Sequence, residues 1–313
     1  MNWTRRDFVK GSAFGAAAAV FPGPLAAVQQ AAPPRAPAPT GPPMFMPLRR
    51  NVGAFTMRGG TIGWLVNGDG VLVVDSQFPD TAPAFLSGLK ERTPRRVDVL
   101  INSHHHGDHT GGNTVFRSSA QKIVAHARSL ENQRNAAQKA GAEVTLPDTT
   151  FTDAWSVKIG DETIRAKHYG PAHTGGDVAI FFEQANVLHL GDLLNNRGYP
   201  NIDVPAGASI HGWIRVLEAI TPEYPADTLF VYGHAESGFG VTGTKADLSY
   251  QRNYFTAILE VVQKAIRQGK SRAEALKLET PTGFEHLGGR KPRLALALGI
   301  AYDELSAQSQ ADL

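Results

Sequence analysis

A hexapeptide rich in metal-binding side chains, placed directly after a short apolar run, constrains the fold of this chain more than any other feature. Residues 104–109 read His-His-His-Gly-Asp-His. The apolar positions before them are Val97, Val99, Leu100 and Ile101. A short apolar run bounded by polar residues is typical of a buried strand. The hexapeptide would then lie in the loop at the C-terminal end of that strand.

The spacing within the hexapeptide can bring several metal ligands together. His104 and His106 are two residues apart, so one extended stretch can direct both imidazoles to the same side. Gly107 permits a bend, and Asp108 and His109 follow it. A mixture of imidazoles and a carboxylate suits zinc and, less selectively, iron or manganese. The loop is therefore a candidate metal site.

Four further short motifs follow strand-like segments elsewhere in the chain. They are Val-Asp-Ser at 74–76, His-Thr-Gly-Gly-Asp at 173–177, Leu-Gly-Asp at 190–192 and Tyr-Gly-His at 232–234. Together with the hexapeptide, these motifs resemble in type and order those of the metallo-β-lactamase superfamily, across roughly residues 50–240. The resemblance implies a four-layer αβ/βα sandwich, in which two sheets pack face to face between layers of helices.

The order of the apolar segments agrees with an α/β protein. Strands are expected near residues 52–56, 61–66, 71–74, 97–101, 123–126, 155–159, 162–168, 178–182, 187–190 and 228–231. Helices are expected near 81–92, 127–140, 210–220, 245–267 and 294–305. Interleaved strands and helices indicate a buried sheet. Periodicity alone does not separate a doubly wound sheet from two packed sheets, so the sandwich rests on the resemblance.

The resemblance also implies two metal positions with a shared carboxylate between them. The ligands would be His104, His106 and His173 for the first metal; Asp108, His109 and His234 for the second; and Asp192 as the bridge. This set implies two zinc ions per chain, with iron or manganese as alternatives because His and Asp accept all three. Asp108 is also the expected catalytic carboxylate, which would orient the attacking hydroxide.

An exported dinuclear zinc hydrolase is the activity that this site favours. Zinc lowers the pKa of a bound water to ~7, and the hydroxide can attack the carbonyl of an ester, thioester, lactone or β-lactam. Many true β-lactamases of the family have Cys or Ser where Asp192 stands, so a glyoxalase-like or lactonase-like enzyme is expected first. Three alternatives stay open: a β-lactamase proper, a mono-iron oxidoreductase resembling persulfide dioxygenases, and a non-catalytic periplasmic accessory metalloprotein.

Polar residues shortly after Asp192 are candidate contacts for a small-molecule substrate. They are Asn196, Arg197 and Tyr199, and the Arg197 guanidinium suits a carboxylate. A solvated loop is the competing interpretation of this segment. The sequence does not indicate an oligomeric state.

The N-terminal segment has the composition of an export signal and a linker. Residues 4–10, Thr-Arg-Arg-Asp-Phe-Val-Lys, resemble a twin-arginine motif, and an Ala-rich apolar run follows at 13–21. The run is shorter than the ~20 residues that span a bilayer, so residues 1–27 are predicted to be a cleaved signal peptide. Residues 28–50 hold seven prolines and are expected to be an extended linker before a catalytic domain at 51–313. The protein would be periplasmic or secreted, without stable membrane insertion after cleavage.

Charge and cysteine content argue against other functions. Loss of residues 1–27 would remove three basic residues and one acidic residue, which leaves 28 of each. A non-specific nucleic-acid binder needs a basic surface, so no nucleic-acid partner is expected. The chain has no cysteine, so no thiolate can serve as ligand or nucleophile.

Overall fold

The structure is a computed structural model that describes residues 41–288 and 291–311. The expected signal peptide, and the expected linker up to residue 40, lie outside the described residues. Within the described part of the chain, no helix combines the length and apolar character that crossing a bilayer requires.

Seven strands form the first sheet, in the order in which they occur along the chain. They are β1 (Met44–Arg49), β2 (Val52–Thr56), β3 (Ile62–Val66), β4 (Val71–Val74), β5 (Val97–Asn102), β6 (Ala120–His126) and β7 (Thr149–Phe151). The strands from β1 to β4 pair antiparallel. Those from β4 to β7 pair parallel, so their carboxyl ends meet at one edge of the sheet.

Six strands form the second sheet, in the order β15-β13-β11-β10-β9-β8. They are β8 (Ala154–Ile159), β9 (Glu162–Lys167), β10 (Ala179–Phe182), β11 (Val187–His189), β13 (Leu229–Val231) and β15 (Thr242–Gly243). Only β11 and β13 pair parallel within this sheet. A separate parallel pair joins β12 (Asn195–Asn196) to β14 (His234–Ala235).

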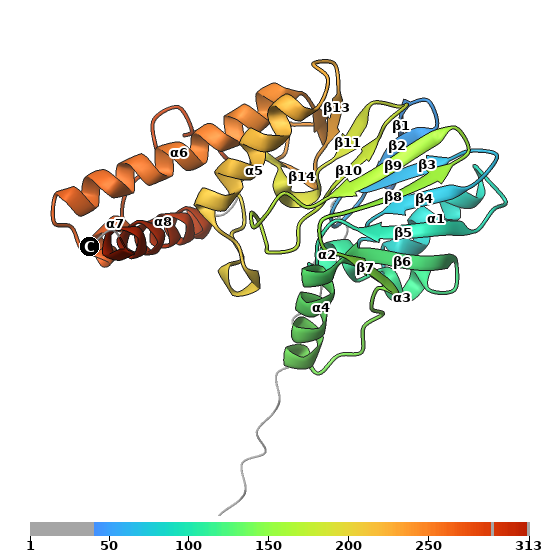
Figure 1. Cartoon of the computed structure of the whole chain (residues 1–313), viewed down its shortest axis with the longest axis horizontal. Coiled ribbons are helices and arrows are strands. Elements are labelled where there is room, and N and C mark those ends of the chain that lie inside the picture. The colour runs from blue at the N-terminus through green and yellow to red at the C-terminus, as the bar shows by residue number, and fades with distance from the viewer. Residues whose placement is uncertain (1–40, 289–290, 312–313) are drawn as a thin grey trace, which may run out of the picture. The chain divides into compact units, whose positions relative to one another are not determined.

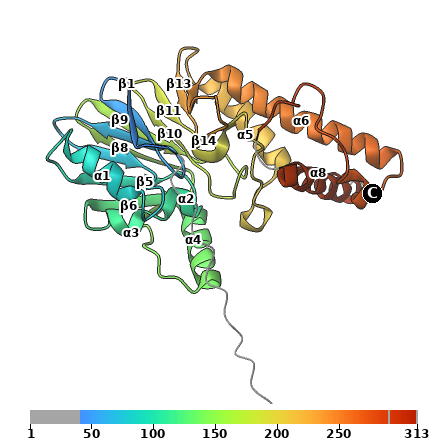
Figure 2. The same cartoon turned by 180° about the vertical axis from the view of Figure 1, so that it is seen from behind.

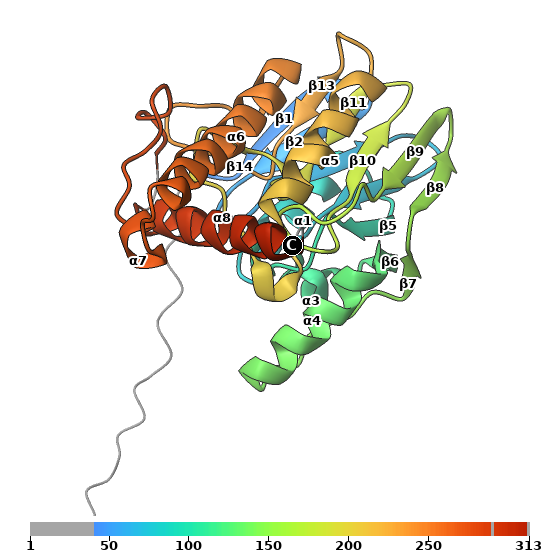
Figure 3. The ribbon, with the colours of Figure 1, turned by 60° about the vertical axis from the view of Figure 1, so that its left-hand side comes forward.

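The helices cover the outer faces of both sheets (Figures 1 and 2). The α-helices are α1 (Ala82–Lys90), α2 (Gly107–Thr110), α3 (Asn113–Phe116), α4 (Ala127–Ala140), α5 (Ile210–Glu223), α6 (Lys245–Arg267), α7 (Arg272–Ala275) and α8 (Lys291–Ala311). Two short 3-10 helices, η1 (Gly191–Leu193) and η2 (Val204–Ala206), follow β11 and β12. Figure 3 shows α5 and α6 in front of the strands of the second sheet.

Three hydrophobic clusters hold the layers together. The two sheets share one cluster, to which Ile101 and Val124 of the first sheet and Ile180 of the second contribute. Outside the second sheet, α5, α6 and α8 pack through residues such as Trp213. Outside the first sheet, α1 packs through residues such as Phe85. The described residues therefore form the expected sandwich of two sheets between helical layers.

The folded region begins earlier than the sequence indicated. Residues 44–49, placed in the expected linker, form β1, which pairs antiparallel with β2 at the edge of the first sheet. The register shifts between Pro47 and Arg49. Proline cannot donate a ladder hydrogen bond, but an edge strand tolerates it. The proline-rich composition therefore predicted a linker where the structure has a strand. Phe45 of this strand packs against Phe55 and Phe85.

Candidate metal centre

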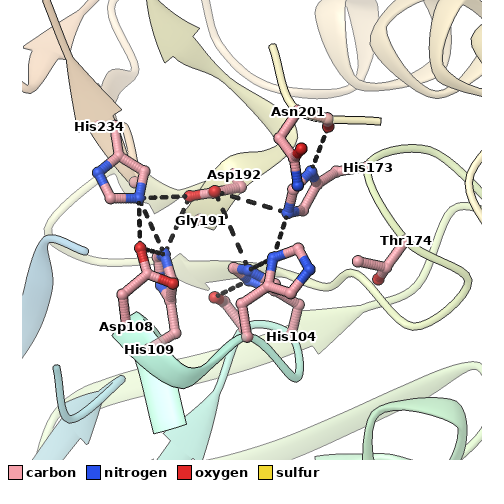
Figure 4. A network of polar contacts seen from close by, with 12 residues as sticks. His104, Asp108, His109, His173, Thr174, Gly191, Asp192, Asn201 and His234 are labelled. Atoms are coloured by element: carbon pink, nitrogen blue, oxygen red, sulfur yellow. Dashed lines mark hydrogen bonds and ion pairs between the residues drawn. The ribbon is translucent and has the colours of Figure 1, made fainter. Parts of the chain in front are cut away.

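The candidate ligands converge where strands of both sheets end. The hexapeptide follows β5, which pairs parallel with β4. Asp192 lies in η1 after β11, and His234 follows β13, the parallel neighbour of β11. His173 lies in the turn before β10. Figure 4 labels six of the seven predicted ligands, all but His106, and shows them grouped around one point. The two sheets therefore bring together side chains that are far apart in sequence.

The first group of ligand atoms is formed by three imidazoles and one carboxylate. Atoms of His104, His106, His173 and Asp192 all lie within 4.8 Å of one another. His106 Nδ1 is 3.1 Å from His104 Nε2 and 2.9 Å from His173 Nε2. His104 and His173 are almost completely buried. The group matches the set expected for a first metal, with Asp192 beside it.

The second group lies directly beside the first. It contains Asp108, His109 and His234, again within 4.8 Å of one another. His234 Nε2 is 3.3 Å from His109 Nε2 and 3.0 Å from Asp108 Oδ2. This group matches the set expected for a second metal.

Asp192 lies between the two groups and directs one oxygen toward each. Its Oδ1 is 3.0 Å from His109 Nε2 and 3.4 Å from His234 Nε2. Its Oδ2 is 3.5 Å from His173 Nε2 and 4.0 Å from His104 Nε2. Oδ1 is buried and has no hydrogen-bond partner among the described residues. A Cβ on Gly233 would collide with this oxygen, so the glycine of Tyr-Gly-His allows the close approach.

Hydrogen bonds outside the two groups leave unprotonated nitrogens facing inward. Nδ1 of His173 donates to Asn201 O at 2.7 Å, Nδ1 of His109 to Asp75 at 2.7 Å, and Nε2 of His106 to Asp203 at 2.8 Å. In the neutral form that a metal ligand requires, each imidazole carries one N–H, so the opposite nitrogens present lone pairs. Lone pairs at about 3 Å repel one another unless a cation lies between them. The donor set therefore fits metal ions.

Burial and neighbouring charges move the pKa values of the two groups in different directions. Burial lowers the pKa of His173 to about 3, against the opposing effect of Asp192. Burial and the nearby His109 lower the pKa of His104 well below its usual range. Burial also acts to lower the pKa of His109, but Asp192 and Asp108 outweigh it and raise that pKa. Burial therefore favours the neutral form of His104 and of His173.

Asp75 of the Val-Asp-Ser motif holds the loop that carries the candidate ligands through hydrogen bonds. Its carboxylate is fully buried and accepts three hydrogen bonds of 2.7 Å: from Ser103 N, from Ser103 Oγ and from His109 Nδ1. Because the Ser103 hydroxyl donates to Asp75, its oxygen accepts from His104 Nδ1, at 3.0 Å. One carboxylate therefore orients a candidate ligand from each group, His109 directly and His104 through the Ser103 hydroxyl.

A short loop between β12 and α5 orients two ligands of the first group. Asn201 O accepts from His173, and Asp203 accepts from His106. Asp203 N donates in turn to His173 O at 3.2 Å. Asp203 Oδ2 also lies 3.5 Å from Nε2 of His105, which belongs to neither group. No pattern in the sequence marked Asn201 or Asp203, because both lie far along the chain from the hexapeptide.

Comparison with known proteins agrees with this geometry. A model of the metallo-beta-lactamase superfamily matches residues 56–235, more than half of the chain. This chain belongs to the metallo-beta-lactamase superfamily. Members of the superfamily are metal-dependent hydrolases, and this member has the His and Asp groups that could hold a metal.

Individual relatives include two kinds of enzyme. A metallo-beta-lactamase type 2 of Bacillus cereus is 27% identical over 170 residues, which cover 54% of this chain and 64% of the relative. A hydroxyacylglutathione hydrolase of Methylococcus capsulatus is 28% identical over 224 residues, or 71% of this chain and 80% of the relative. The solved metallo-beta-lactamase from Pontibacter korlensis superposes with a TM-score of 0.58 at 19% identity, covering 69% and 99% of the two chains. That likeness confirms the sandwich fold of the superfamily.

The predicted substrate contacts in this superfamily member face its own interior. Arg197 is ion-paired with Asp247 at 3.0 Å and stacked on Tyr250, with 3.9 Å from guanidinium to ring centre. Asn196 Nδ2 donates to Gly240 O at 2.8 Å, and Tyr199 Oη lies 2.6 Å from Thr280 Oγ1. From the segment that follows Asp192, the residues that line the cavity at the metal centre are instead Asn195, Pro200 and Asn201. Substrate contact by Asn196, Arg197 or Tyr199 stays a prediction.

A cavity of about 520 Å³ opens over the two groups of ligands. Beyond the ligands, its walls include Phe78, Trp213, Glu236 and Arg293. A second cavity of about 500 Å³ continues from it past Phe78 and Asp108, toward Met44 and Met57. The candidate metal centre therefore lies at the bottom of a cleft that can admit a small molecule.

Proposed function

We propose that this chain is a dinuclear zinc hydrolase acting on a carbonyl substrate: an ester, thioester, lactone or β-lactam. The observation that carries the proposal is the position of Asp192, with one carboxylate oxygen near each group of ligands. Two histidine-containing groups on either side of a shared carboxylate could each hold one metal ion. Zinc bound there would lower the pKa of a water to ~7 and so supply a nucleophile at neutral pH.

The protein's own side chains contribute orientation and proton transfer. His104, His106 and His173 have their outer N–H groups engaged, so their inner nitrogens are already directed for ligation. Such pre-oriented ligands lower the cost of binding a metal in the correct geometry. The walls of the cavity then hold the substrate with its carbonyl over the cluster and limit the access of bulk water.

Asp108 is the carboxylate of this cluster that we assign to catalysis. Its side chain is 29% exposed, whereas that of Asp192 is 12% exposed. Asp108 lines both cavities. It can therefore accept a proton from the attacking water and present that water to a carbonyl. A positioned general base of this kind contributes about 10²–10⁴-fold to the rate.

The two kinds of relative support the choice of carbonyl chemistry. One bears the name metallo-beta-lactamase and the other hydroxyacylglutathione hydrolase. Many true β-lactamases have Cys or Ser at the position of Asp192, so this aspartate favours a glyoxalase-like or lactonase-like enzyme. Hydrolysis of β-lactams is the alternative. We also propose that the protein is exported by the twin-arginine route, on the sequence of residues 4–21.

Metal content and turnover of the exported protein test the function. We expect about two zinc ions per chain by elemental analysis, and hydrolysis of at least one member of a panel of esters, thioesters, lactones and β-lactams. A single iron per active chain would replace the proposal with a mono-iron oxidoreductase. Full zinc loading without turnover of any substrate would leave a non-catalytic metalloprotein.

A single substitution separates catalysis from metal storage. Asp108→Asn keeps the shape but removes the charge, and we expect turnover to fall by ~10²–10⁴-fold while the melting temperature changes little. The matched control is Asp161→Asn, at an exposed carboxylate that pairs with Arg50 and lines neither cavity of the cleft. Turnover of Asp108→Asn within about threefold of the unaltered enzyme would show that Asp108 is not catalytic.

A further inference from the structure

One arginine outside the matched family region faces the cavity at the metal centre. Arg293 lies in the first turn of α8, is half-buried, and lines the same cavity as Asp108 and His173. The family model ends at residue 235, so the match does not include this helix. The helix brings a permanent positive charge to the rim of the cleft, because guanidinium stays protonated in proteins.

The cleft has two other arginines beside it, and both are neutralised by a carboxylate. Arg58 pairs with Asp80, and Arg197 pairs with Asp247. Arg293, in contrast, has no carboxylate partner among the described residues. Its single hydrogen bond there runs from Nη1 to Tyr199 O, at 3.0 Å. Guanidinium has five N–H donors in a planar fork, so most of the donors of Arg293 remain available to a ligand.

Two asparagines that line the same cavity also have side chains without a hydrogen-bond partner among the described residues. Asn195 and Asn201 line the cavity, and each is tied to the protein through its backbone: Asn195 N donates to Gln251 Oε1, and Asn201 O accepts from His173. No hydrogen bond engages their side-chain amides within residues 41–288 and 291–311. The lining of this cavity therefore combines an unpaired cation with two free amides.

We propose that Arg293 forms a carboxylate-binding subsite, so that the natural substrate carries a carboxylate some distance from its scissile carbonyl. The inference rests on the proposed function, because the metal cluster would hold the carbonyl while Arg293 holds the acid. The fork of guanidinium matches a carboxylate with two parallel hydrogen bonds. The free amides of Asn195 and Asn201 would bind polar groups between the two ends.

Glu236 also lines this cavity, and it limits where a negatively charged group can bind. It lines both cavities but forms no ion pair with Arg293 within the described residues. Its negative charge repels a carboxylate placed near it and so favours binding of that carboxylate at Arg293. Replacing Glu236 with glutamine should therefore tighten the binding of acids, the opposite effect to loss of Arg293.

A pair of chromogenic esters that differ in one charge tests the subsite. Mono-4-nitrophenyl glutarate has a free carboxylate, and its methyl ester has the same leaving group without the charge; succinate and adipate homologues vary the spacing. In the zinc-loaded enzyme, Arg293→Met should raise KM for the best acid by about 10- to 100-fold, as expected for loss of a charge-assisted hydrogen bond. The kcat for the acid and both constants for the methyl ester should change less than about threefold. Arg293→Lys, which keeps the charge, should recover part of the loss.

A matched control tests whether a shift of α8, and not loss of the guanidinium, causes the change in KM. Arg272 forms an exposed ion pair with Asp303 of α8, at 2.7 and 2.9 Å, and does not line the cavity. Arg272→Gln should leave KM for the acid and for the methyl ester unchanged. Equal KM effects of Arg293→Met on the two esters would show that the residue only supports the fold, and would overturn the subsite.

Calorimetric binding of dicarboxylates separates failure of the subsite from failure of the hydrolase. Succinate, glutarate and adipate should each be compared with butyrate, which has a single carboxylate. At least one dicarboxylate should bind the zinc-loaded protein more tightly than butyrate, and Arg293→Met should abolish the difference. If no ester is hydrolysed, the proposed hydrolase is wrong, but the binding difference still decides the subsite. If esters are hydrolysed while dicarboxylates and butyrate bind alike, the subsite is wrong and the hydrolase stands.

Discussion

Replacing Asp75 with asparagine should weaken both the fold and the affinity for metal, although Asp75 is not itself a candidate ligand. Asp75 accepts hydrogen bonds from Ser103 N, Ser103 Oγ and His109 Nδ1, each of 2.7 Å, and is fully buried. Asparagine has one acceptor oxygen and one NH₂ group. In one orientation the NH₂ faces the Ser103 amide, and in the other it faces the His109 N–H. Either way, at least one buried donor loses its acceptor, because Oδ2 accepts from both the Ser103 hydroxyl and His109.

The magnitude follows from that count of one lost acceptor. A buried donor left without a partner costs about 1–3 kcal/mol. For a folded region of this size, each kcal/mol lowers the melting temperature by about 2–4 °C. The metal-free Asp75→Asn variant should therefore melt roughly 2–12 °C below the unaltered protein. Because His109 loses its orienting partner, zinc affinity should also fall by about 10- to 100-fold, as is typical when the partner of a ligand is removed.

The assay combines thermal melting after chelation with zinc titration against a chromophoric chelator. Glu162→Gln is the control, since Glu162 is buried and accepts from two backbone amides, Gln184 N at 2.8 Å and Ala185 N at 3.1 Å. It lies at the start of β9, among neither group of candidate ligands. This control should lose stability but keep its zinc affinity. If Asp75→Asn keeps both its melting temperature and its zinc affinity, the orienting role of Asp75 is wrong.

Three further outcomes are expected. Asp203→Ala releases Nε2 of His106 and should lower zinc affinity by about 10- to 100-fold; an unchanged affinity in chelator competition would contradict this. Phe85→Ala removes a fully buried ring whose centre lies 5.3 Å from that of Phe55. The free energy of unfolding in urea should fall by about 3–5 kcal/mol. The control Val144→Ala, at an exposed side chain, should lower it by less than about 0.5 kcal/mol. Replacing both arginines at residues 5 and 6 with lysine should retain the protein in the cytoplasm, and undiminished periplasmic protein on fractionation would refute twin-arginine export.

Several elements were predictable because their signals are local. The helix at Ala127–Ala140 and the strand at Val71–Val74 have the bounds that the sequence indicated. The long helix Lys245–Arg267 also matches, and its first turn has a capping box formed by Thr244 and Asp247. Strands buried on both faces, such as Val71–Val74, read as continuous apolar runs. The three-residue strand Thr149–Phe151 has no such apolar run and is too short to show a period.

The sequence by itself determined which side chains could bind metal, because ligand chemistry belongs to residue types and the motifs are a few residues long. It did not determine which residues would surround them. Asp203 reaches His106 across 97 positions, and Arg293 reaches the cavity through a helix that follows the last motif. Arg197, the arginine nearest to Asp192 in sequence, is directed instead to Asp247. Such contacts depend on how loops and helices pack over the sheet edge, and short-range patterns carry no information about that packing.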